Sequence, residues 1–345
     1  MVNFQFNNKN FSKISVKFLE KIAAAVGVIF LLVIFYVCLE VYIPLNAASN
    51  ETVTFTVQKG WSDDEIAVNL QKLGIIRSSY FFKLYAILSL KHSQLQAGEY
   101  SLSPKMSAYE IANKMAQGDV IRDKIVILEG WDINDIGKYL ESKGICKQDY
   151  FVSLAKKDYS DKFTFLEDKP KDADLQGYLF PDSYEIFKGE SCEDILGAML
   201  ANFDQKLTPA LRAEIKNQKK SIFDVAIMAS LLEKEVSTLS DKEIVSGILW
   251  KRISISMPLQ LDSTIIYITG NPDISVKDKQ INSLYNTYKY YGLPKGPISN
   301  PGMDSLTAAI YPKATNYWYY LTDGKTIFSE TLDEHNAAKA KYLGS

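Results

Sequence analysis

The first long apolar stretch in the chain runs from residue 22 to residue 39 and carries no charged side chain. At the rise of an α-helix this length nearly spans the hydrocarbon core of a membrane, which needs roughly 20 residues. Four lysines and one glutamate precede it, and an excess of positive charge marks the cytoplasmic side. The pattern predicts a cytoplasmic tail (1–21), a single transmembrane helix (22–44) through the cytoplasmic (inner) membrane, and a periplasmic remainder.

A cleaved signal peptide is the alternative interpretation of this segment. Its apolar core would be shorter, about 7–15 residues, and the stretch Leu45–Ala48 is a poor cleavage site. We therefore expect the helix to be retained as an anchor. Glu40 would then reach water at the outer end of the helix.

Two similar segments follow the anchor, and each joins a β-type run to a helical pattern. The runs are Val53–Val57 and Ile125–Leu128, and Trp61 and Trp131 stand at the start of the helical parts. Each tryptophan either packs inside a repeated scaffold or binds glycan. Residues 52–150 are therefore interpreted as LysM-like strand–helix repeats.

Residues 151–345 are predicted to form a mixed α+β domain, so the whole chain is expected to be α+β with one transmembrane helix. A loop over residues 175–184 contains Gly177 and Pro181, which break any helix. The loop is too apolar for ordinary exposed chain. It either packs into the core or lines a groove, and in the second case Tyr184 would contact a ligand.

A helix is predicted from residue 222 to about residue 236, and two carboxylates lie at its end. Successive side chains rotate by about 100°, so Glu233 and Glu235 point about 160° apart and could not share one substrate. Glu233 shares its face with small side chains such as Ser230 and Ser237. A roomy, partly apolar site suits a general acid, whereas the ordinary alternative is a solvated surface position. Glu235 is expected to pack with a solvated tip.

Polar and aromatic residues further along the chain are candidates for sugar binding. In an extended segment Gln260 and Asp262 would project to one side; equally, Asp262 could cap a short helix that ends near Gly270. A later loop combines aromatic rings with amides, which is typical of carbohydrate recognition and also of core packing. Its candidate residues are Tyr285, Asn286, Tyr288 and Asn300.

Composition narrows the possible chemistry. The formal net charge is −2, with 39 basic and 41 acidic residues, and no nucleic acid partner is expected because phosphate binding needs a basic surface. With three cysteines, two histidines and no ligand-like spacing between them, neither a metal site nor a cofactor is predicted. Cys38 lies in the apolar stretch, whereas Cys146 and Cys192 could pair only if the fold brings them together.

Several ordered motifs together resemble the endolytic murein transglycosylase, or YceG-like, family along nearly the whole chain. The motifs are Leu175–Tyr184, Ala229–Glu235, Leu259–Asp262, Tyr285–Tyr288, Gly292–Pro294 and Asn300–Gly302. Two positions depart from the family pattern, since Gln176 replaces a glutamate and Ser263 replaces a proline.

The resemblance implies an endolytic lytic transglycosylase that cuts the MurNAc–GlcNAc bond of nascent peptidoglycan strands and thereby terminates their elongation. Glu233 would protonate the glycosidic oxygen and then accept the proton of the MurNAc C6 hydroxyl, leaving a 1,6-anhydro end. Cell-wall synthases, the penicillin-binding proteins, are the implied partners. The alternatives are a non-catalytic, membrane-anchored peptidoglycan-binding scaffold and a hydrolase that uses water.

Overall fold

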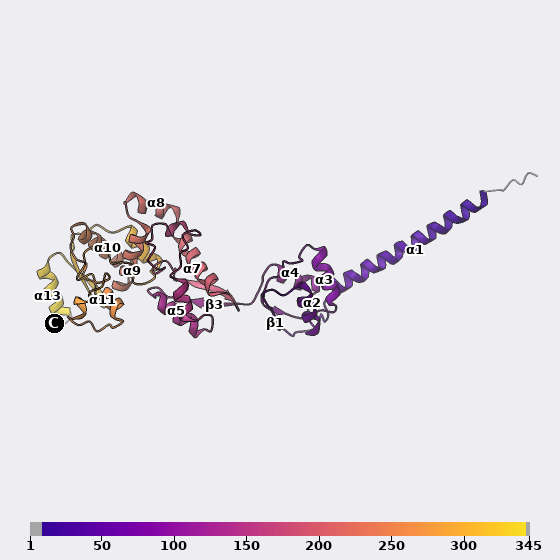
Figure 1. The fold of residues 1–345 in the computed structure, drawn as a ribbon, viewed down its shortest axis with the longest axis horizontal. Helices are drawn as coiled ribbons and strands as arrows, with labels where there is room; N and C mark the ends of the chain where they lie inside the picture. The colour runs from indigo at the N-terminus through magenta and orange to yellow at the C-terminus, as the bar shows by residue number, and fades with distance from the viewer. Residues whose placement is uncertain (1–8, 343–345) are drawn as a thin grey trace, which may run out of the picture. The chain divides into compact units, whose positions relative to one another are not determined.

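The computed structural model describes the backbone of residues 9–342 and the side chains of residues 18–342. It divides into two compact units, Met1–Asp123 (unit 1) and Lys124–Ser345 (unit 2), and each is described by itself (Figure 1). The first eight residues of the predicted cytoplasmic tail, and the side chains of its first three lysines, lie outside the described part.

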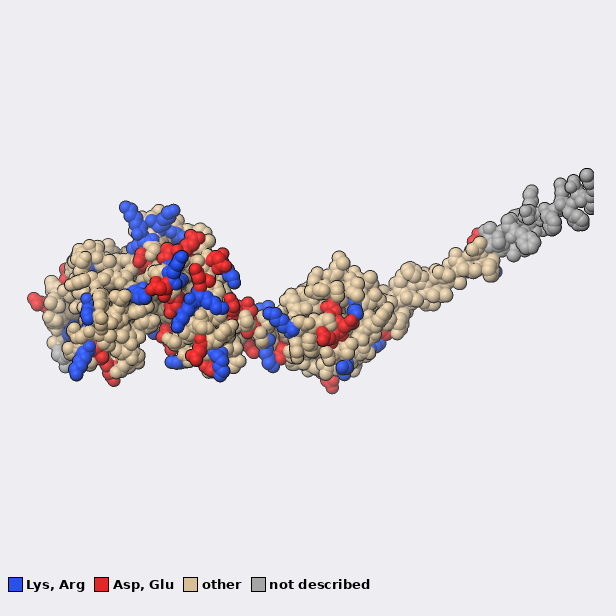
Figure 2. Space-filling view, in the orientation of Figure 1, with Lys and Arg blue, Asp and Glu red and all other residues tan. Residues whose placement is uncertain are grey.

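Helix α1 (Lys9–Tyr42) contains the predicted membrane span. From Phe18 to Tyr42 it is long and apolar enough to cross a membrane, and no other described helix is. Between Lys21 and Glu40 this helix carries no charged side chain, and its surface is tan in Figure 2. The predicted N-terminal apolar helix is therefore confirmed.

The rest of unit 1 is a small α+β module with its own core. Strands β1 and β2 pair antiparallel, with Val53 opposite Leu102 and Val57 opposite Gly98. Their inward side chains pack with those of the helices, and Phe82 and Tyr100 are fully buried there. The elements are β1 (Val53–Val57), α2 (Asp63–Lys72), α3 (Ser79–Leu88), β2 (Gly98–Leu102) and α4 (Ala108–Ala116).

The end of α1 packs against α3 and α4 of this module. The ring of Tyr42 lies 6.4 Å from that of Tyr85 and 5.2 Å from that of Tyr109, measured between centroids. Glu40 is buried, with 8% of its surface exposed, and its carboxylate lies 3.9 Å from the guanidinium of Arg77. The expectation that Glu40 reaches water is wrong, because the module covers this turn of the helix.

The second sequence copy forms the same order of elements as the first, but it belongs to unit 2. Strand β3 is followed by two helices and, after an inserted 3-10 turn, by β4, which pairs with β3. The structure thus divides the predicted 52–150 region at residue 123, and the second copy is completed only by β4. The elements are β3 (Arg122–Val126), α5 (Ile133–Ser142), α6 (Gln148–Leu154), η1 (Thr164–Leu166) and β4 (Ser183–Phe187).

Both tryptophans of the copies pack within their units. Trp61 lies 6.4 Å from the ring of Phe55, and Trp131 lies 5.2 Å from that of Tyr139. Each is half-buried against the core of its unit. These contacts match the packing alternative for the two residues.

The remainder of unit 2 is mostly helical and ends in a hairpin and a helix. A capping box at Ser221 opens α9. Helix α10 begins at Leu239, where the Thr238 hydroxyl accepts a hydrogen bond from the N–H of Asp241. The elements are α7 (Cys192–Lys206), α8 (Pro209–Asn217), α9 (Ile222–Glu235), α10 (Leu239–Ser254), α11 (Asp262–Thr269), η2 (Asp278–Gln280), α12 (Met303–Ile310), β5 (Tyr319–Asp323), β6 (Lys325–Ser329) and α13 (Leu332–Tyr342).

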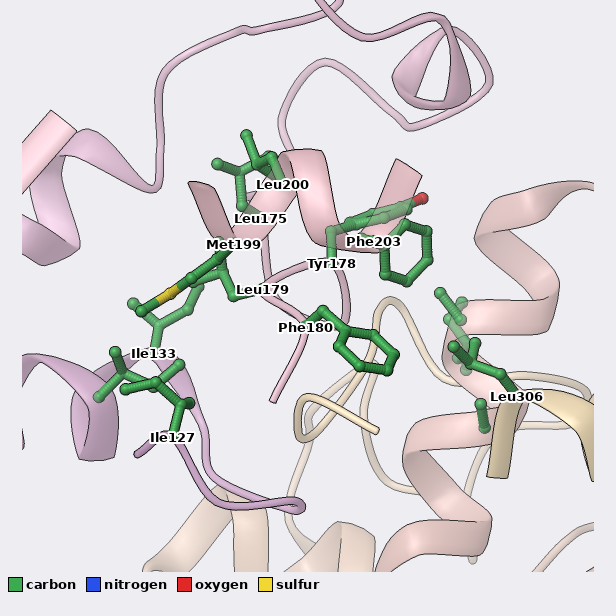
Figure 3. Packing of buried hydrophobic residues seen from close by; sticks show 14 of the residues in the cluster. Ile127, Ile133, Leu175, Tyr178, Leu179, Phe180, Met199, Leu200, Phe203 and Leu306 are labelled. Atoms are coloured by element: carbon green, nitrogen blue, oxygen red, sulfur yellow. The ribbon is translucent and has the colours of Figure 1, made fainter. Parts of the chain in front are cut away.

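The loop over residues 175–184 packs into the core of unit 2 instead of lining a groove. Figure 3 shows Tyr178 beside Phe203 of α7, with Phe180 nearby, and the rings of Tyr178 and Phe203 lie 5.3 Å apart. The backbone of the loop is held by Asn300, whose Oδ1 accepts hydrogen bonds from the N–H groups of Gly177 (2.9 Å) and Leu179 (3.0 Å). The loop is therefore part of the core of unit 2, fixed to the segment that contains Asn300.

Cys146 and Cys192 form a disulfide, with 5.9 Å between their Cα atoms. The bond joins the turn between α5 and α6 to the first residue of α7. It therefore links the second sequence copy to the larger helical part of unit 2, and it resolves a pairing that the sequence left open.

Candidate active site

Glu233 lies in a closed set of hydrogen bonds at the end of α9. Its Oε1 accepts from Nζ of Lys242 (3.2 Å), and its Oε2 accepts from the N–H of Gly302 (3.0 Å) and the hydroxyl of Ser305 (2.7 Å). Its side chain is 9% exposed and that of Lys242 is 4% exposed. An ion-pair partner and two further donors therefore hold this carboxyl group in one position.

The serines expected beside Glu233 lie elsewhere. Ser230 donates to the carbonyl of Ile227 (2.7 Å) and accepts from the N–H of Ile298 (3.0 Å), and Ser237 is exposed. That expectation is wrong because Ser230 faces the chain that precedes α12. Ser305 supplies the hydroxyl instead.

Glu129 is a second carboxylate near Glu233, and the sequence analysis did not single it out. Burial, followed by the negative charge of Glu233, raises the pKa of Glu129. A Cβ atom on Gly302 would come within 1.9 Å of the Glu129 carboxylate oxygen. Glycine at this position therefore lets the Glu129 side chain lie against the start of α12.

Glu235 points to the other side of α9, into an open cavity of about 570 Å³. The hydroxyl of Tyr320 donates to its Oε2 (2.8 Å). Burial raises the pKa of Glu235, while the hydrogen bond from Tyr320 acts in the opposite direction. The side chain is half-buried, and the β5–β6 hairpin supplies the hydroxyl that meets its carboxyl group.

The cavity contains three of the predicted sugar-binding residues, namely Gln260, Asp262 and Tyr288. Tyr288 donates a short hydrogen bond to Asp262, and Nζ of Lys279 lies 3.1 Å from both Asp262 Oδ1 and the Tyr288 hydroxyl. The full lining is Lys234, Glu235, Arg252, Leu259, Gln260, Leu261, Asp262, Ser263, Ile266, Lys279, Tyr288, Tyr319, Tyr320, Leu321, Thr322, Leu332, His335 and Lys339.

Asp262 is the first residue of α11, and Gly270 ends that helix in a left-handed conformation with φ of 70°. The helical alternative for this segment is therefore the one that the structure adopts. Gln260 precedes the helix with φ of 54°, and its N–H bonds the carbonyl of Thr287 (3.0 Å). The exposed side chains of Gln260 and Asp262 thus reach the cavity from a bend and a helix start, not from a strand.

Four other candidates are placed outside this cavity. Asn286 is fully buried and donates to the carbonyls of Lys279 and Ile281, and Asn300 is fully buried behind the loop it holds. Tyr184 donates to Phe180 O (2.5 Å) within the same loop. Tyr285 packs against Tyr267, with 5.0 Å between ring centroids. In the structure these side chains stabilise loops.

The hairpin and the last helix contribute residues that were not among the predicted site residues. Arg252 is buried and donates to the carbonyls of Trp318 (2.8 Å) and Leu259 (2.9 Å), so it fixes the hairpin beside the start of α11. His335 of α13 stacks on Tyr319, with 5.3 Å between ring centroids, and burial lowers the pKa of its imidazole. The only sequence signal was the concentration of aromatic residues before the hairpin turn.

A second cavity of about 380 Å³ lies beside the first. Lys234, Ser263 and Ile266 line both cavities, so the two adjoin at these residues and are together called the cleft. The residues that line the second cavity, here called the side chamber, are Asp132, Asp135, Lys234, Ser263, Ile266, Tyr267, Gly270 and Ile298.

Among the described residues no group of three or more His, Cys, Asp or Glu side chains is placed to hold a metal ion. Of the two carboxyl groups in the main cavity, Asp262 is paired with Lys279, whereas Glu235 has no cationic partner among the described side chains. The fold and the site define an α+β protein with an N-terminal apolar helix and an open polar cavity in which Glu235 is the acid without an ion-pair partner in the described part of the chain.

Comparison with known proteins gives the family. A model described as "YceG-like family" matches residues 55–341. The chain is 35% identical over 318 residues to the protein named endolytic murein transglycosylase in Bacillus subtilis (strain 168), covering 88% of each. It is 28% identical over 343 residues to the protein of that name in Streptococcus pneumoniae serotype 2 (strain D39 / NCTC 7466), covering 89% of this chain and 61% of the relative.

A solved structure shows the same similarity to YceG-like proteins. The crystal structure of a yceG-like protein from Listeria monocytogenes matches with a TM-score of 0.58 and 32% identity, covering 84% of this chain and 100% of that one. The chain belongs to the YceG-like family, and the resemblance seen in its motifs is confirmed.

Proposed function

We propose that this protein is an endolytic lytic transglycosylase that cleaves the MurNAc–GlcNAc bond of peptidoglycan strands and leaves 1,6-anhydro-MurNAc ends. The name of its relatives supports this activity. The single observation that carries it is Glu235, a half-buried acid without a cationic partner in an open polar cavity. A reaction that needs one group as acid and then as base needs no second carboxylate.

Glu235 is proposed as the acid/base in preference to Glu233. Glu233 is held by Lys242, Gly302 and Ser305 and lines neither part of the cleft. Protonating a substrate from that position would require breaking a buried ion pair, which is costly. Glu235 has the raised pKa that a general acid needs and already faces the space where a sugar would bind.

The mechanism follows from the surroundings of Glu235. In its neutral form the carboxyl group protonates the glycosidic oxygen, and the 2-acetamido group of the substrate stabilises the sugar cation. The Tyr320 hydroxyl, already 2.8 Å away, stabilises the carboxylate that is left. That carboxylate then accepts the proton of the C6 hydroxyl, whose oxygen closes the anhydro ring. Gln260, Asp262 and Tyr288 are placed to bind sugar hydroxyl groups in the same cavity.

Two matched variants test the assignment. Glu235→Gln should abolish cleavage of purified glycan strands, while Glu233→Gln should retain it wherever that variant is folded, as judged by circular dichroism. Mass spectrometry of the products distinguishes anhydro ends from the hydrated ends of a hydrolase. Full activity of Glu235→Gln would refute its role, and loss only in Glu233→Gln would restore the assignment made from sequence. A non-catalytic scaffold predicts no products at all.

We also propose that the N-terminus lies in the cytoplasm and that both units lie outside the inner membrane. The lysine-rich segment before the helix supports this orientation. So does the Cys146–Cys192 disulfide, because such bonds persist in oxidising compartments. Alkylation of intact cells with a membrane-impermeant reagent, at a cysteine introduced on the surface of unit 2, would test it. Labelling only after lysis would reject the orientation.

Unit 1 is proposed to be a LysM-like glycan-binding module, and cell-wall synthases are proposed partners. The support for glycan binding is its repeated strand–helix pattern and compact independent core. Cosedimentation of the full-length Glu235→Gln variant with insoluble peptidoglycan, with and without deletion of residues 52–118, would measure the contribution of the module. Unchanged binding after the deletion would argue against the proposal.

A further inference from the structure

The main cavity has the side chamber as its direct neighbour. Lys234 follows Glu233 and precedes Glu235 on α9, and with Ser263 and Ile266 it borders both spaces. A ligand bound at Glu235 therefore has a neighbouring space of about 380 Å³ into which a substituent can extend. This volume lies within the range of pockets that hold small ligands.

The side chamber has charges of both signs that are not used within the protein. Lys234 is exposed and forms no hydrogen bond or ion pair with any described residue. Asp132 and Asp135 each use one oxygen in the capping box at the start of α5, Oδ1 and Oδ2 respectively. Their other oxygens accept no bond from the described side chains and backbone, so both remain available to a ligand.

The rest of the chamber wall is apolar. Ile266 is an exposed hydrophobic residue at 37%, Tyr267 is half-buried beside it, and Ile298 closes the wall with 2% exposure. A site with an apolar wall, one free ammonium and two free carboxylate oxygens is complementary to a zwitterionic peptide. A neutral sugar could offer these three groups hydroxyl hydrogen bonds but no opposite charge, whereas a zwitterionic peptide offers both.

We propose that the side chamber binds the peptide attached to the lactyl group of the muramyl sugar, so that the enzyme prefers strands that carry their peptides. The inference rests on the proposed function, in which a glycan strand lies at Glu235. A carboxylate of the peptide would pair with Lys234, and an amino group of the peptide would pair with Asp132 or Asp135. The apolar side chains of the peptide would lie on Ile266 and Tyr267.

The first experiment measures kcat/KM on two substrates with the full-length protein in detergent. One is the intact strand and the other is the same strand after an amidase has removed its peptides. The wild type should prefer the intact strand by about tenfold or more, as expected for one charge-assisted contact. Lys234→Gln and Asp135→Asn should bring the ratio of the two values toward one, whereas Lys138→Gln, an exposed lysine outside the cleft, should leave the ratio unchanged. Equal cleavage of both substrates by the wild type would overturn the proposal.

A binding measurement separates this proposal from the proposed function. Titration calorimetry of the Glu235→Gln variant with a muramyl peptide should give a Kd about tenfold or more below that for N-acetylmuramic acid. Adding Lys234→Gln should remove the difference. If the wild type cleaves neither strand but the muramyl peptide still binds through Lys234, the result supports peptide binding in the side chamber and contradicts the proposed transglycosylase function. Equal binding of the two ligands would overturn the proposal that the side chamber binds the peptide, and would leave the proposed function untouched.

Discussion

The hydroxyl of Tyr320 donates a 2.8 Å hydrogen bond to the carboxyl group of Glu235, across 85 positions of sequence. The bond joins strand β5 to the end of helix α9, and Arg252 holds the hairpin in place through the carbonyl of Trp318. The environment of the proposed acid is therefore set by the last part of the chain rather than by its own helix.

Removing the Tyr320 hydroxyl should move the pH dependence of cleavage. This hydrogen bond stabilises the ionised carboxyl group and opposes the rise in the pKa of Glu235 that burial causes. Tyr320→Phe should raise that pKa further, so activity should be lost at a higher pH on the alkaline side of the kcat profile. Tyr317→Phe, in the same hairpin region but stacked on Phe328, is the control. A shift to lower pH would contradict the proposed role.

The two glutamates of α9 should differ in their effects on stability. Because its pKa is raised on folding, Glu235 keeps its proton to higher pH in the folded protein than in the unfolded chain. Its contribution therefore declines as the pH rises from the ordinary pKa of a glutamate through the raised one. Glu235→Gln should flatten that decline in denaturant midpoints measured along a pH series. Parallel curves for the variant and the wild type would show that the carboxyl group is not desolvated.

Glu233→Gln should instead destabilise the protein at neutral pH. The change leaves Lys242 buried without its ionic partner, and loss of one member of a buried pair costs about 3–5 kcal/mol, less whatever the new amide recovers. Urea unfolding monitored by tryptophan fluorescence would measure it. No change in midpoint would mean that the ion pair contributes little, and the double variant with Lys242→Met tests this directly.

Gly177→Ala should be strongly destabilising, and Gly189→Ala provides a matched comparison. Both glycines have φ of 89°, but only at Gly177 would a Cβ atom meet neighbours, at 2.6 Å from Cγ of Pro297. Left-handed backbone alone costs about 1–2 kcal/mol for an alanine, and overpacking adds about 1–3 kcal/mol. We expect the loss of unfolding free energy to be about 1 kcal/mol or more larger at Gly177. Equal losses would show that Pro297 moves freely.

Reduction of the Cys146–Cys192 disulfide should lower the free energy of unfolding of unit 2. With a sequence separation of 46, the chain-entropy model gives about 4 kcal/mol as the contribution of such a loop. Cys146→Ser with Cys192→Ser should behave as the reduced wild type in urea unfolding. The wild type should respond to reductant and the double variant should not. A response in both would implicate another effect of the reductant.

The separation of Glu233 and Glu235 follows from the helix period alone, and the structure shows them in different surroundings. The sequence of α9 does not show which of the two glutamates lines the cleft. The surroundings of Glu233 come from Lys242, Gly302 and Ser305. Those of Glu235 include the distant Tyr320. The small residues beside Glu233 indicated space in the sequence, but α12 fills that space.

The amide-bearing loops show a related limit of sequence-based prediction. An asparagine among aromatic residues has the same pattern whether it binds a sugar or satisfies the backbone. Asn300 bonds two N–H groups that lie more than 100 positions away, so its structural role exists only once the loop at Gly177 has folded against it. Local signals were more informative, since the helix end near Gly270 depends only on adjacent residues.

The packing of Tyr42 against Tyr85 and Tyr109 gives the anchor a mechanical consequence. The end of the helix packs against the folded module, and Glu40 is buried in the junction. The helix and the module are therefore not separated by a flexible linker. Once such a helix crosses a bilayer, its module stands at a set height above the lipid and turns whenever the helix turns. A glycan that grows outward from the membrane would then reach unit 1 at a fixed distance from the lipid. That distance would set the length of strand needed for the first contact.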